Sequence, residues 1–165
     1  MRALIIGRFQ PFHKGHLLLA KEMEENEPIF AIGSAYNSFS FENPFTAGER
    51  YEMIYNAMEE AGIRKFFILP IPDINRYGVY AKHVIDLSPS FDFVISNNEL
   101  IIELFEREGY EVKRTKLYNR QEYQGKVIRK RIAENKKWEH LVPESVANFI
   151  KKIGGDKRIR KLFLE

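Results

Sequence analysis

The sequence predicts a single α/β domain built on a parallel β-sheet. Short apolar runs alternate with segments of helical periodicity, and no repeat, low-complexity segment or Gly/Ser-rich linker divides the chain. Its 165 residues, 44% of them hydrophobic, are enough for one domain with a substantial core. The absence of cysteine excludes disulfide scaffolds, thiolate nucleophiles and cysteine-based metal sites.

The N-terminal segment predicts a strand, a helix and a second strand. Residues 1–7 form an apolar run closed by glycine, which is typical of a buried central strand. A helix follows from His13 to about Asn26, because its leucines recur at helical spacing. The apolar segment 28–34 then predicts the second strand.

The next segment predicts a loop, a helix and a third strand. Residues 35–45 are rich in Ser, Asn and aromatic residues and predict the loop. Thr46 and Glu49 match the capping-box pattern, so a helix begins there and continues to Gly62. Residues 65–70 predict a strand that ends at a proline.

The remaining elements continue the alternation of strands and helices. Two further strands, over 91–96 and 110–113, complete a Rossmann-like parallel sheet with helices on both faces. From about residue 120 the chain becomes helical and ends in a short basic tail that begins at Gly154. The predicted helices cover residues 79–87, 99–108, 125–135 and 143–153.

The first strand-to-helix turn, residues 7–16, is the expected ligand site, since such sheets bind ligands beyond the carboxyl ends of their strands. Gly7 and Gly15 allow close approach of the backbone. His13 and His16 lie three residues apart, so one face of a helical turn presents both rings. Arg8 adds a positive charge, and the helix N-terminus attracts anions.

Several interpretations of the two histidines compete. A zinc pair lacks ligands, because the chain has only His83 and His140 besides these two and no cysteine. Two histidines satisfied in a loop are the plain structural alternative. The turn matches neither the Walker A pattern nor the dinucleotide fingerprint. A phosphate clamp made of arginine, two histidines and a helix N-terminus remains the functional interpretation.

Four segments resemble one enzyme family. His13-Lys14-Gly15-His16 matches the H-x-G-H signature of the nucleotidyltransferase superfamily, and the run GRFQPFHKGH closely resembles the opening of nicotinamide mononucleotide (NMN) adenylyltransferases of the archaeal type. The segments 43–50, 119–129 and 138–143 are similar to that family's later motifs. The resemblance covers nearly the whole chain and implies a single nucleotidyltransferase domain over residues 1–165.

The resemblance implies transfer of AMP from ATP to NMN, giving NAD and pyrophosphate, with Mg²⁺ bound to the ATP phosphates and no metal held by protein ligands alone. It implies catalytic roles for Arg8, His13, His16 and Arg129. Tyr80 and Asn98 would bind NMN, although a core aromatic and a helix cap are the structural alternatives. The ATP and phosphate contacts implied are Gly7, Phe9, Gly15, Arg50, Gly125 and Lys126.

The third motif departs from the family pattern S-x-T-x-x-R. Gln124 and Lys126 replace both hydroxyl residues, while Arg129 is retained. Lys126 supplies a point charge in place of a hydroxyl hydrogen bond. The departure keeps open a different phosphate acceptor, such as pantetheine phosphate or flavin mononucleotide.

The formal charge of +3 is unevenly distributed. Residues 1–112 hold 10 Lys/Arg and 17 Asp/Glu, whereas residues 113–137 hold 10 Lys/Arg and only two acidic residues. This basic stretch suits an anionic partner. A nucleotide- or RNA-binding protein without catalysis, using Tyr118 and Tyr123 for stacking, is one alternative, but the stretch lacks an RNA-binding signature. We therefore expect ATP and NMN as partners rather than nucleic acid.

The sequence also predicts the setting of the protein. No apolar run approaches the ~18 residues of a membrane span, and a strand begins too early to leave room for a signal peptide. We expect no membrane partner and a cytoplasmic location. The family resemblance further implies a homo-oligomer, commonly a hexamer.

Overall fold

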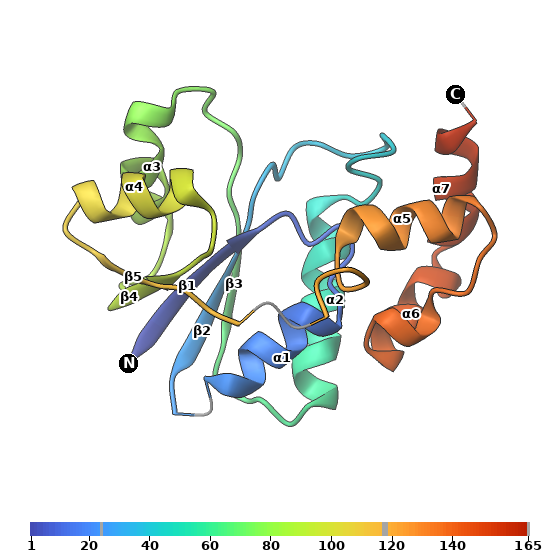
Figure 1. Cartoon of the computed structure of the whole chain (residues 1–165), viewed down its shortest axis with the longest axis horizontal. Helices are drawn as coiled ribbons and strands as arrows, with labels where there is room; N and C mark the ends of the chain where they lie inside the picture. The colour runs from blue at the N-terminus through green and yellow to red at the C-terminus, as the bar shows by residue number, and fades with distance from the viewer. Residues whose placement is uncertain (24, 117–118, 165) are drawn as a thin grey trace.

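Five parallel strands form the centre of the computed structural model, in the order β3-β2-β1-β4-β5 (Figure 1). The structure describes residues 1–23, 25–116 and 119–164. Ile5 of β1 lies opposite Phe30 of β2 and Ile95 of β4, and all four strand pairs are parallel. The strands are β1 (Arg2–Gly7), β2 (Glu27–Ile32), β3 (Phe67–Pro70), β4 (Phe93–Ile95) and β5 (Glu111–Lys113).

Helices cover both faces of the sheet, as predicted. Alternate residues of each strand point to opposite faces, so Leu4 and Ile5 of β1 enter two separate cores. The core that contains Leu4 includes residues of α3 and α4, and the core that contains Ile5 includes residues of the other five helices. The helices are α1 (Lys14–Glu22), α2 (Ala47–Glu60), α3 (Tyr80–Leu87), α4 (Glu99–Arg107), α5 (Gly125–Ala133), α6 (Glu144–Lys152) and α7 (Gly155–Phe163).

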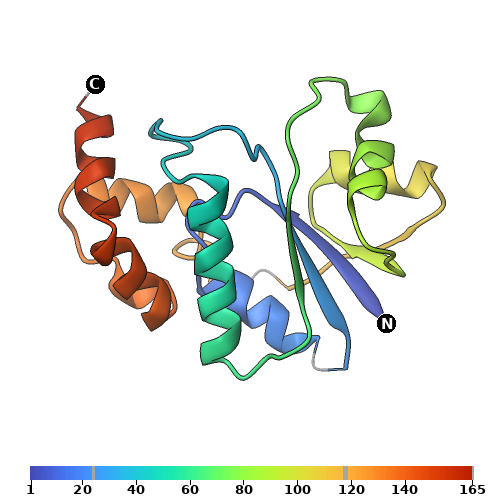
Figure 2. The same cartoon turned by 180° about the vertical axis from the view of Figure 1, so that it is seen from behind.

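The C-terminal helices extend the larger core rather than forming a second one. In Figure 2, α6 and α7 lie beside α2, on the side away from the sheet. Ile132 of α5, Ile150 of α6 and Ile159 of α7 are completely buried in the same cluster as Phe30 of the sheet. The segment from about residue 120 therefore shares the core of the remainder of the chain.

The prediction of a short tail from Gly154 was wrong, because α7 occupies residues 155–163. Gly154 instead takes a left-handed conformation (φ 71°) between α6 and α7, and Gly155 packs so closely on Phe45 that a Cβ would lie 2.8 Å from its ring. Ile159 then anchors the helix in the core.

The first helix is shorter than predicted and ends at Glu22. The chain must turn there to start β2 beside β1, where Glu27 N–H donates to the carbonyl oxygen of Met1 at 2.9 Å. Within the described ranges, no helix has both the length and the apolar character needed to cross a membrane.

Candidate active site

Two cavities open where the strands end, on either side of Arg8. The chain runs from β1 to β2 on one side and crosses to β4 on the other, so this is the switch point of the sheet, where such folds bind ligands. The cationic cavity, of about 260 Å³, is lined by Arg8, Phe9, Gln10, Pro11, His13, His16, Gln124, Gly125, Lys126 and Arg129. The aromatic cavity, of about 360 Å³, is lined by Ile6, Gly7, Arg8, Gly33, Ser34, Asp73, Tyr77, Tyr80, Ser96, Asn98, Leu100, Ile101 and Leu104.

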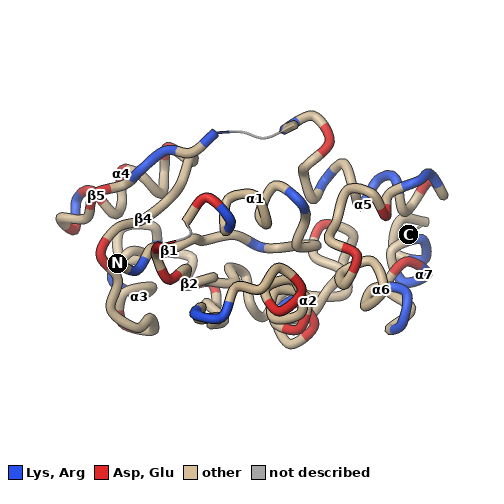
Figure 3. The backbone as a smooth tube through the Cα atoms, turned by 90° about the horizontal axis from the view of Figure 1, so that it is seen from below, with Lys and Arg blue, Asp and Glu red and all other residues tan. Residues whose placement is uncertain are grey.

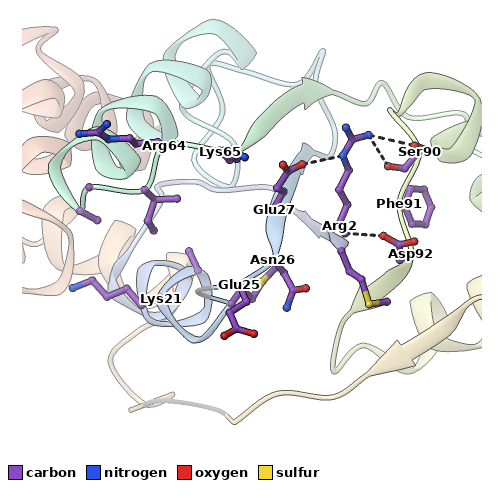
Figure 4. A pocket seen from close by; sticks show the side chains of 16 residues that line it. Arg2, Lys21, Glu25, Asn26, Glu27, Arg64, Lys65, Ser90, Phe91 and Asp92 are labelled. Atoms are coloured by element: carbon purple, nitrogen blue, oxygen red, sulfur yellow. Dashed lines mark hydrogen bonds and ion pairs between the residues drawn. The ribbon is translucent and has the colours of Figure 1, made fainter.

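A larger cavity, of about 940 Å³, lies at the opposite, amino-terminal ends of the strands (Figure 4). None of the predicted site residues lines it. Arg2 is engaged there with its neighbours: its Nε donates to Glu27 at 3.1 Å and its Nη1 to Ser90 at 3.2 Å. Cavity volume alone therefore does not identify the candidate site. The carboxyl ends of the strands and the positive charge gathered there identify it.

His13 and His16 stack on one another in the first turn of α1, with ring centroids 3.6 Å apart. His13 caps the helix, because its Nδ1 accepts from Gly15 N–H at 3.1 Å. His16 Nδ1 accepts from His13 N–H at 3.1 Å in return. A Cβ on Gly15 would lie 2.9 Å from the His13 ring, so this close cap requires glycine.

These bonds fix the tautomer of both rings. A nitrogen that accepts carries no proton, so each neutral ring carries its proton on Nε2. Burial lowers the pKa of His13 to about 3, and burial together with the charge of His13 lowers that of His16 well below 6.5. Two neutral Nε2–H donors therefore stand at the cationic cavity, suited to phosphate oxygens.

The histidine pKa values predict a loss of stability in acid. Unfolded histidine binds a proton near pH 6.5 and folded His13 only near pH 3, so stability falls as the pH drops below about 6.5. His13 alone accounts for about 2 kcal/mol between pH 7 and pH 5. Urea unfolding at both pH values, for wild type and His13→Gln, measures the difference. Equal pH dependence of the two proteins would contradict the assignment.

Arg129 lines the cationic cavity from the buried face of α5. Its Nη1 donates to the carbonyl oxygen of Gln10 at 2.7 Å, and the side chain is 4% exposed. Its Nε is buried and has no partner among the described residues. Burial, followed by the charge of Arg8, lowers its pKa to about 10, so the guanidinium stays charged at neutral pH. A charged guanidinium that lines the cavity and is held in place by a backbone carbonyl is suited to an anionic ligand.

Gly125 makes the approach of α5 to the first turn possible. A Cβ there would lie 2.7 Å from Arg129 Nη1 and 3.1 Å from the Gln10 carbonyl oxygen. Lys126, the next residue, is exposed and lines the same cavity. The altered third motif thus still delivers Lys126 and Arg129 to one place.

Replacement of Gly125 by alanine is expected to displace the Arg129 guanidinium. Because misplacing such a group by about 1 Å costs up to ~10²-fold in rate, we expect kcat/KM for ATP to fall about 10- to 100-fold. Steady-state kinetics checks this, with Gly48→Ala as the matched control. Gly48 also lies in the first turn of a helix, and its Cβ would meet nothing closer than 3.9 Å. Equal activities of the two variants would refute the role of Gly125.

Arg50 was predicted to bind phosphate, but the structure places its guanidinium among backbone carbonyls. Arg50 is completely buried, and its guanidinium donates to the backbone carbonyls of residues 8, 33, 34, 35, 37 and 46 at 2.9–3.4 Å. Burial, followed by the charge of Arg8, lowers its pKa to about 10. Its donors are committed to the backbone because the loops after β1 and β2 have no strand partners there. Arg50 therefore positions these loops and lines neither cavity.

The aromatic cavity collects the residues expected to bind NMN. Tyr80, at the start of α3, is half-buried and lines the cavity with Tyr77. Burial and then the charge of Asp73 raise the pKa of the Tyr80 hydroxyl, so it stays neutral. Asn98 lines the cavity and also caps α4, where its Oδ1 accepts from Leu100 and Ile101 N–H. Asn98 is therefore a helix cap that also borders the aromatic cavity.

Gly7 and Phe9, two of the predicted ATP or phosphate contacts, line the cavities. Gly7 ends β1 and lines the aromatic cavity; a Cβ there would lie 3.1 Å from the Phe9 ring. Phe9 lines the cationic cavity but is 2% exposed, and its ring packs edge-on against His16 at 4.7 Å. Phe9 thus packs against the His16 ring and helps to hold it in place.

Sequence reasoning missed two residues at this site. Gln10 is buried and exchanges two hydrogen bonds with the backbone of Phe45, at 2.9 and 3.0 Å, while its carbonyl holds Arg129. Asp73 accepts from Ser34 Oγ at 3.1 Å and from Asn37 Nδ2 at 3.4 Å. In the sequence, Gln10 is recognisable only as a polar residue beside Pro11, and Asp73 only as an acidic residue after Pro72. Neither position indicates which residues the side chain will contact.

The basic stretch is divided by the fold. Lys126 and Arg129 reach the cationic cavity, whereas Arg131 pairs with Glu122 at 3.8 Å and Lys136 with Glu134 at 3.7 Å. Figure 3 shows these cations along and after α5, at the end of the molecule that also holds α7. Tyr118, the first of the two predicted stacking residues, lies outside the described residues, while Tyr123 packs beside Gly15.

The chain is similar to known proteins over nearly its whole length. A family model described as cytidylyltransferase-like matches residues 4–131. The chain is 51% identical over 164 residues to the nicotinamide-nucleotide adenylyltransferase of Methanococcus aeolicus, which covers 98% of this chain and 95% of that protein. It is 47% identical over 169 residues to the protein of the same name from Archaeoglobus fulgidus, covering 98% and 97%. The chain belongs to the nicotinamide-nucleotide adenylyltransferase family.

Membership of this family confirms the resemblance carried by the sequence motifs. The family model begins in β1 and ends in α5, so it includes both histidines and Arg129. A crystal structure from Francisella tularensis, of a bifunctional NMN adenylyltransferase/ADP ribose pyrophosphatase complexed with AMP and a manganese ion, has the same fold. It superposes with a TM-score of 0.80 at 22% identity and covers 99% of this chain, which spans about half of that protein (52%).

Proposed function

We propose that the protein transfers the adenylyl group of ATP to nicotinamide mononucleotide, producing NAD and pyrophosphate. One observation carries the proposal: Arg8 lines both the cationic and the aromatic cavity. A triphosphate in the first cavity and a nucleotide monophosphate in the second would meet at this guanidinium. Family membership over nearly the full chain supports the same two substrates.

In the proposed reaction, a 5′-phosphate oxygen of NMN attacks the α-phosphorus of ATP. The new P–O bond forms as the bond to the bridging oxygen of the β-phosphate breaks, and pyrophosphate leaves with the electron pair. The attacking phosphate is largely ionised at neutral pH, because its second pKa is about 6. No general base is required, which fits two histidines that are already donors.

Catalysis is then a matter of position and charge. Arg129 and Lys126 would hold the phosphates of ATP, and the two histidine Nε2–H groups would donate to their oxygens. Arg8, exposed between the cavities, would neutralise charge where the two phosphates approach. Donors that are held in place by Gln10 and Gly15 need little reorganisation in the transition state.

Magnesium would enter with ATP as part of that substrate. The described residues contain no group of three or more His, Cys, Asp or Glu side chains that could hold a metal. Mg²⁺ commonly keeps its waters and binds substrate phosphates instead of a protein cage. The ion would supply charge neutralisation on the departing pyrophosphate.

The aromatic cavity would take the nicotinamide half of NMN. Its pyridinium ring is cationic, and Tyr80 offers a flat face to it. Asp73, held by Ser34 and Asn37, adds a negative charge in the same cavity. The chemistry of the lining therefore suits a cationic ring better than a neutral one.

Asp73→Asn is expected to raise KM for NMN about three- to fivefold, the size of a partly exposed charge interaction. KM for ATP should stay unchanged, because Asp73 lines only the aromatic cavity. Asp86→Asn, on the exposed surface of α3, is the matched control. An equal change in both KM values would argue against a specific role in binding NMN.

A direct assay tests the proposed function. Purified protein is mixed with Mg²⁺, ATP and NMN, and NAD and pyrophosphate are measured by chromatography. Pantetheine phosphate and flavin mononucleotide serve as competing acceptors, because Gln124 and Lys126 depart from the family motif. Absence of NAD at high enzyme concentration, or a preference for another acceptor, would overturn the proposal.

We also propose a homo-oligomer in the cytoplasm, as family resemblance implies. Light scattering on the purified protein measures its molar mass against 19.5 kDa for one chain. A monomer at micromolar concentration would remove this part of the proposal.

A further inference from the structure

Arg158, in the last helix, is hydrogen-bonded to the first turn of α2 and to the segment that precedes it. Its Nη1 and Nη2 donate to the two carboxylate oxygens of Glu49 at 2.7 and 2.8 Å, and Nη1 also donates to the Pro44 carbonyl at 3.1 Å. The guanidinium lies 4.7 Å from the centre of the Phe39 ring. Such a bidentate, partly buried pair fixes both distance and orientation.

The segment that Arg158 holds is also hydrogen-bonded to the first strand-to-helix turn, residues 7–16. Asn43 precedes Pro44, and its Oδ1 accepts from Arg8 Nη1 at 3.2 Å. Phe45 follows Pro44 and is bonded to Gln10 in both directions. Glu49, the partner of Arg158, accepts from Thr46 N–H at 2.9 Å in the capping box of α2. Residues 43–46 therefore lie between α7 and Arg8 with bonds to both.

We propose that Arg158 is a positioning residue: through residues 43–46 and Asn43 it sets the position of the Arg8 guanidinium. The inference rests on the proposed function, in which Arg8 stands between the two substrates. Arg158 touches neither cavity, and no sequence motif singles it out. Arg8 is itself exposed, and Asn43 is its side-chain anchor among the described residues. An exposed arginine has many rotamers, so an external anchor matters for its position.

A double-variant cycle with Arg158→Gln and Asn43→Ala tests the coupling. We expect each single variant to lower kcat/KM for ATP about five- to tenfold, the scale of a modest displacement. In this proposal Arg158 acts on Arg8 through Asn43, so the two substitutions disrupt the same connection. The kcat/KM of the double variant should therefore be no more than about twofold below that of the less active single variant. Fold-changes that multiply, or an Arg158→Gln enzyme with wild-type kinetics, would overturn the inference.

Arg160→Gln is the matched control, since Arg160 lies on the same helix and pairs only with Asp156, at 3.4 Å, among the described residues. It should retain wild-type kcat/KM. All variants are assayed at a temperature at which circular dichroism shows them fully folded, so a merely structural loss does not enter the rates.

Calorimetric titration with Mg·ATP alone separates the inference from the proposed function. The affinity of Arg158→Gln for ATP should fall by about the same factor as its kcat/KM. A wild type that binds ATP but forms no NAD would refute the proposed function and leave the affinity comparison valid. Full NAD formation with unchanged ATP affinity in Arg158→Gln would refute the inference alone.

Discussion

Arg129→Ala is expected to lower kcat about 10²- to 10³-fold, the loss found when one preorganised donor to a developing charge is removed. Arg129 is the buried cation of the cationic cavity, and its Nε has no partner among the described residues. A charge-assisted hydrogen bond from a guanidinium that is buried and already held in place is stronger than one from an exposed side chain. The loss should therefore exceed that of any exposed lysine in the basic stretch.

Steady-state kinetics with varied ATP checks this expectation, with two further variants beside it. Lys130→Ala removes the same charge from the next, exposed position of α5 and should retain near-wild-type activity. Arg129→Lys keeps a charge but cannot reproduce the guanidinium fork, so it should recover only part of the rate. Equal kcat for Arg129→Ala and Lys130→Ala would contradict the role of Arg129.

Arg50→Met is expected to lower the free energy of unfolding by about 4 kcal/mol or more. The substitution leaves up to six backbone carbonyls without their donor, and each buried unsatisfied group costs about 1–3 kcal/mol. Some of these carbonyls will find water, so the costs do not simply add. Against a typical total stability of about 5–15 kcal/mol, the loss is severe.

Urea unfolding followed by circular dichroism measures this loss. Arg64→Met is the matched control, because Arg64 is an exposed arginine just after the same helix, and its substitution should change stability by less than about 0.5 kcal/mol. Arg50→Lys separates charge from geometry: an ammonium group has three donors and cannot serve six carbonyls. A stable Arg50→Met protein that has lost only ATP binding would restore Arg50 to the phosphate site.

Arg50 also illustrates what a sequence can and cannot predict. The capping box of Thr46 and Glu49 is local, so the start of α2 was predicted correctly. The direction of the Arg50 side chain depends on the carbonyls of residues 8, 33, 34, 35 and 37, which only the folded sheet brings to it. From the sequence alone, an arginine one turn into a helix near a candidate phosphate site looks like a ligand contact. The structure shows that its partners are backbone carbonyls instead.

The strands and most helices were predictable because their signals are periodic and local, as in the buried run of β1. The last helix was not, since its packing depends on Gly155 lying against Phe45, about a hundred residues earlier in the chain. The same holds for Arg158, whose partners are in α2 and the segment before it. Long-range contacts of this kind leave no pattern near the residue itself.

His13 has a consequence for anyone who engineers this protein for heat resistance. Rules for helix ends favour Ser, Asp or Asn at the position that His13 occupies, and such a change commonly stabilises a helix. Here the cap bond to Gly15 is also what turns the imidazole proton toward the cavity. A design procedure that scores stability alone would replace this residue early and remove a donor. Stability and activity are thus traded against each other at a single side chain.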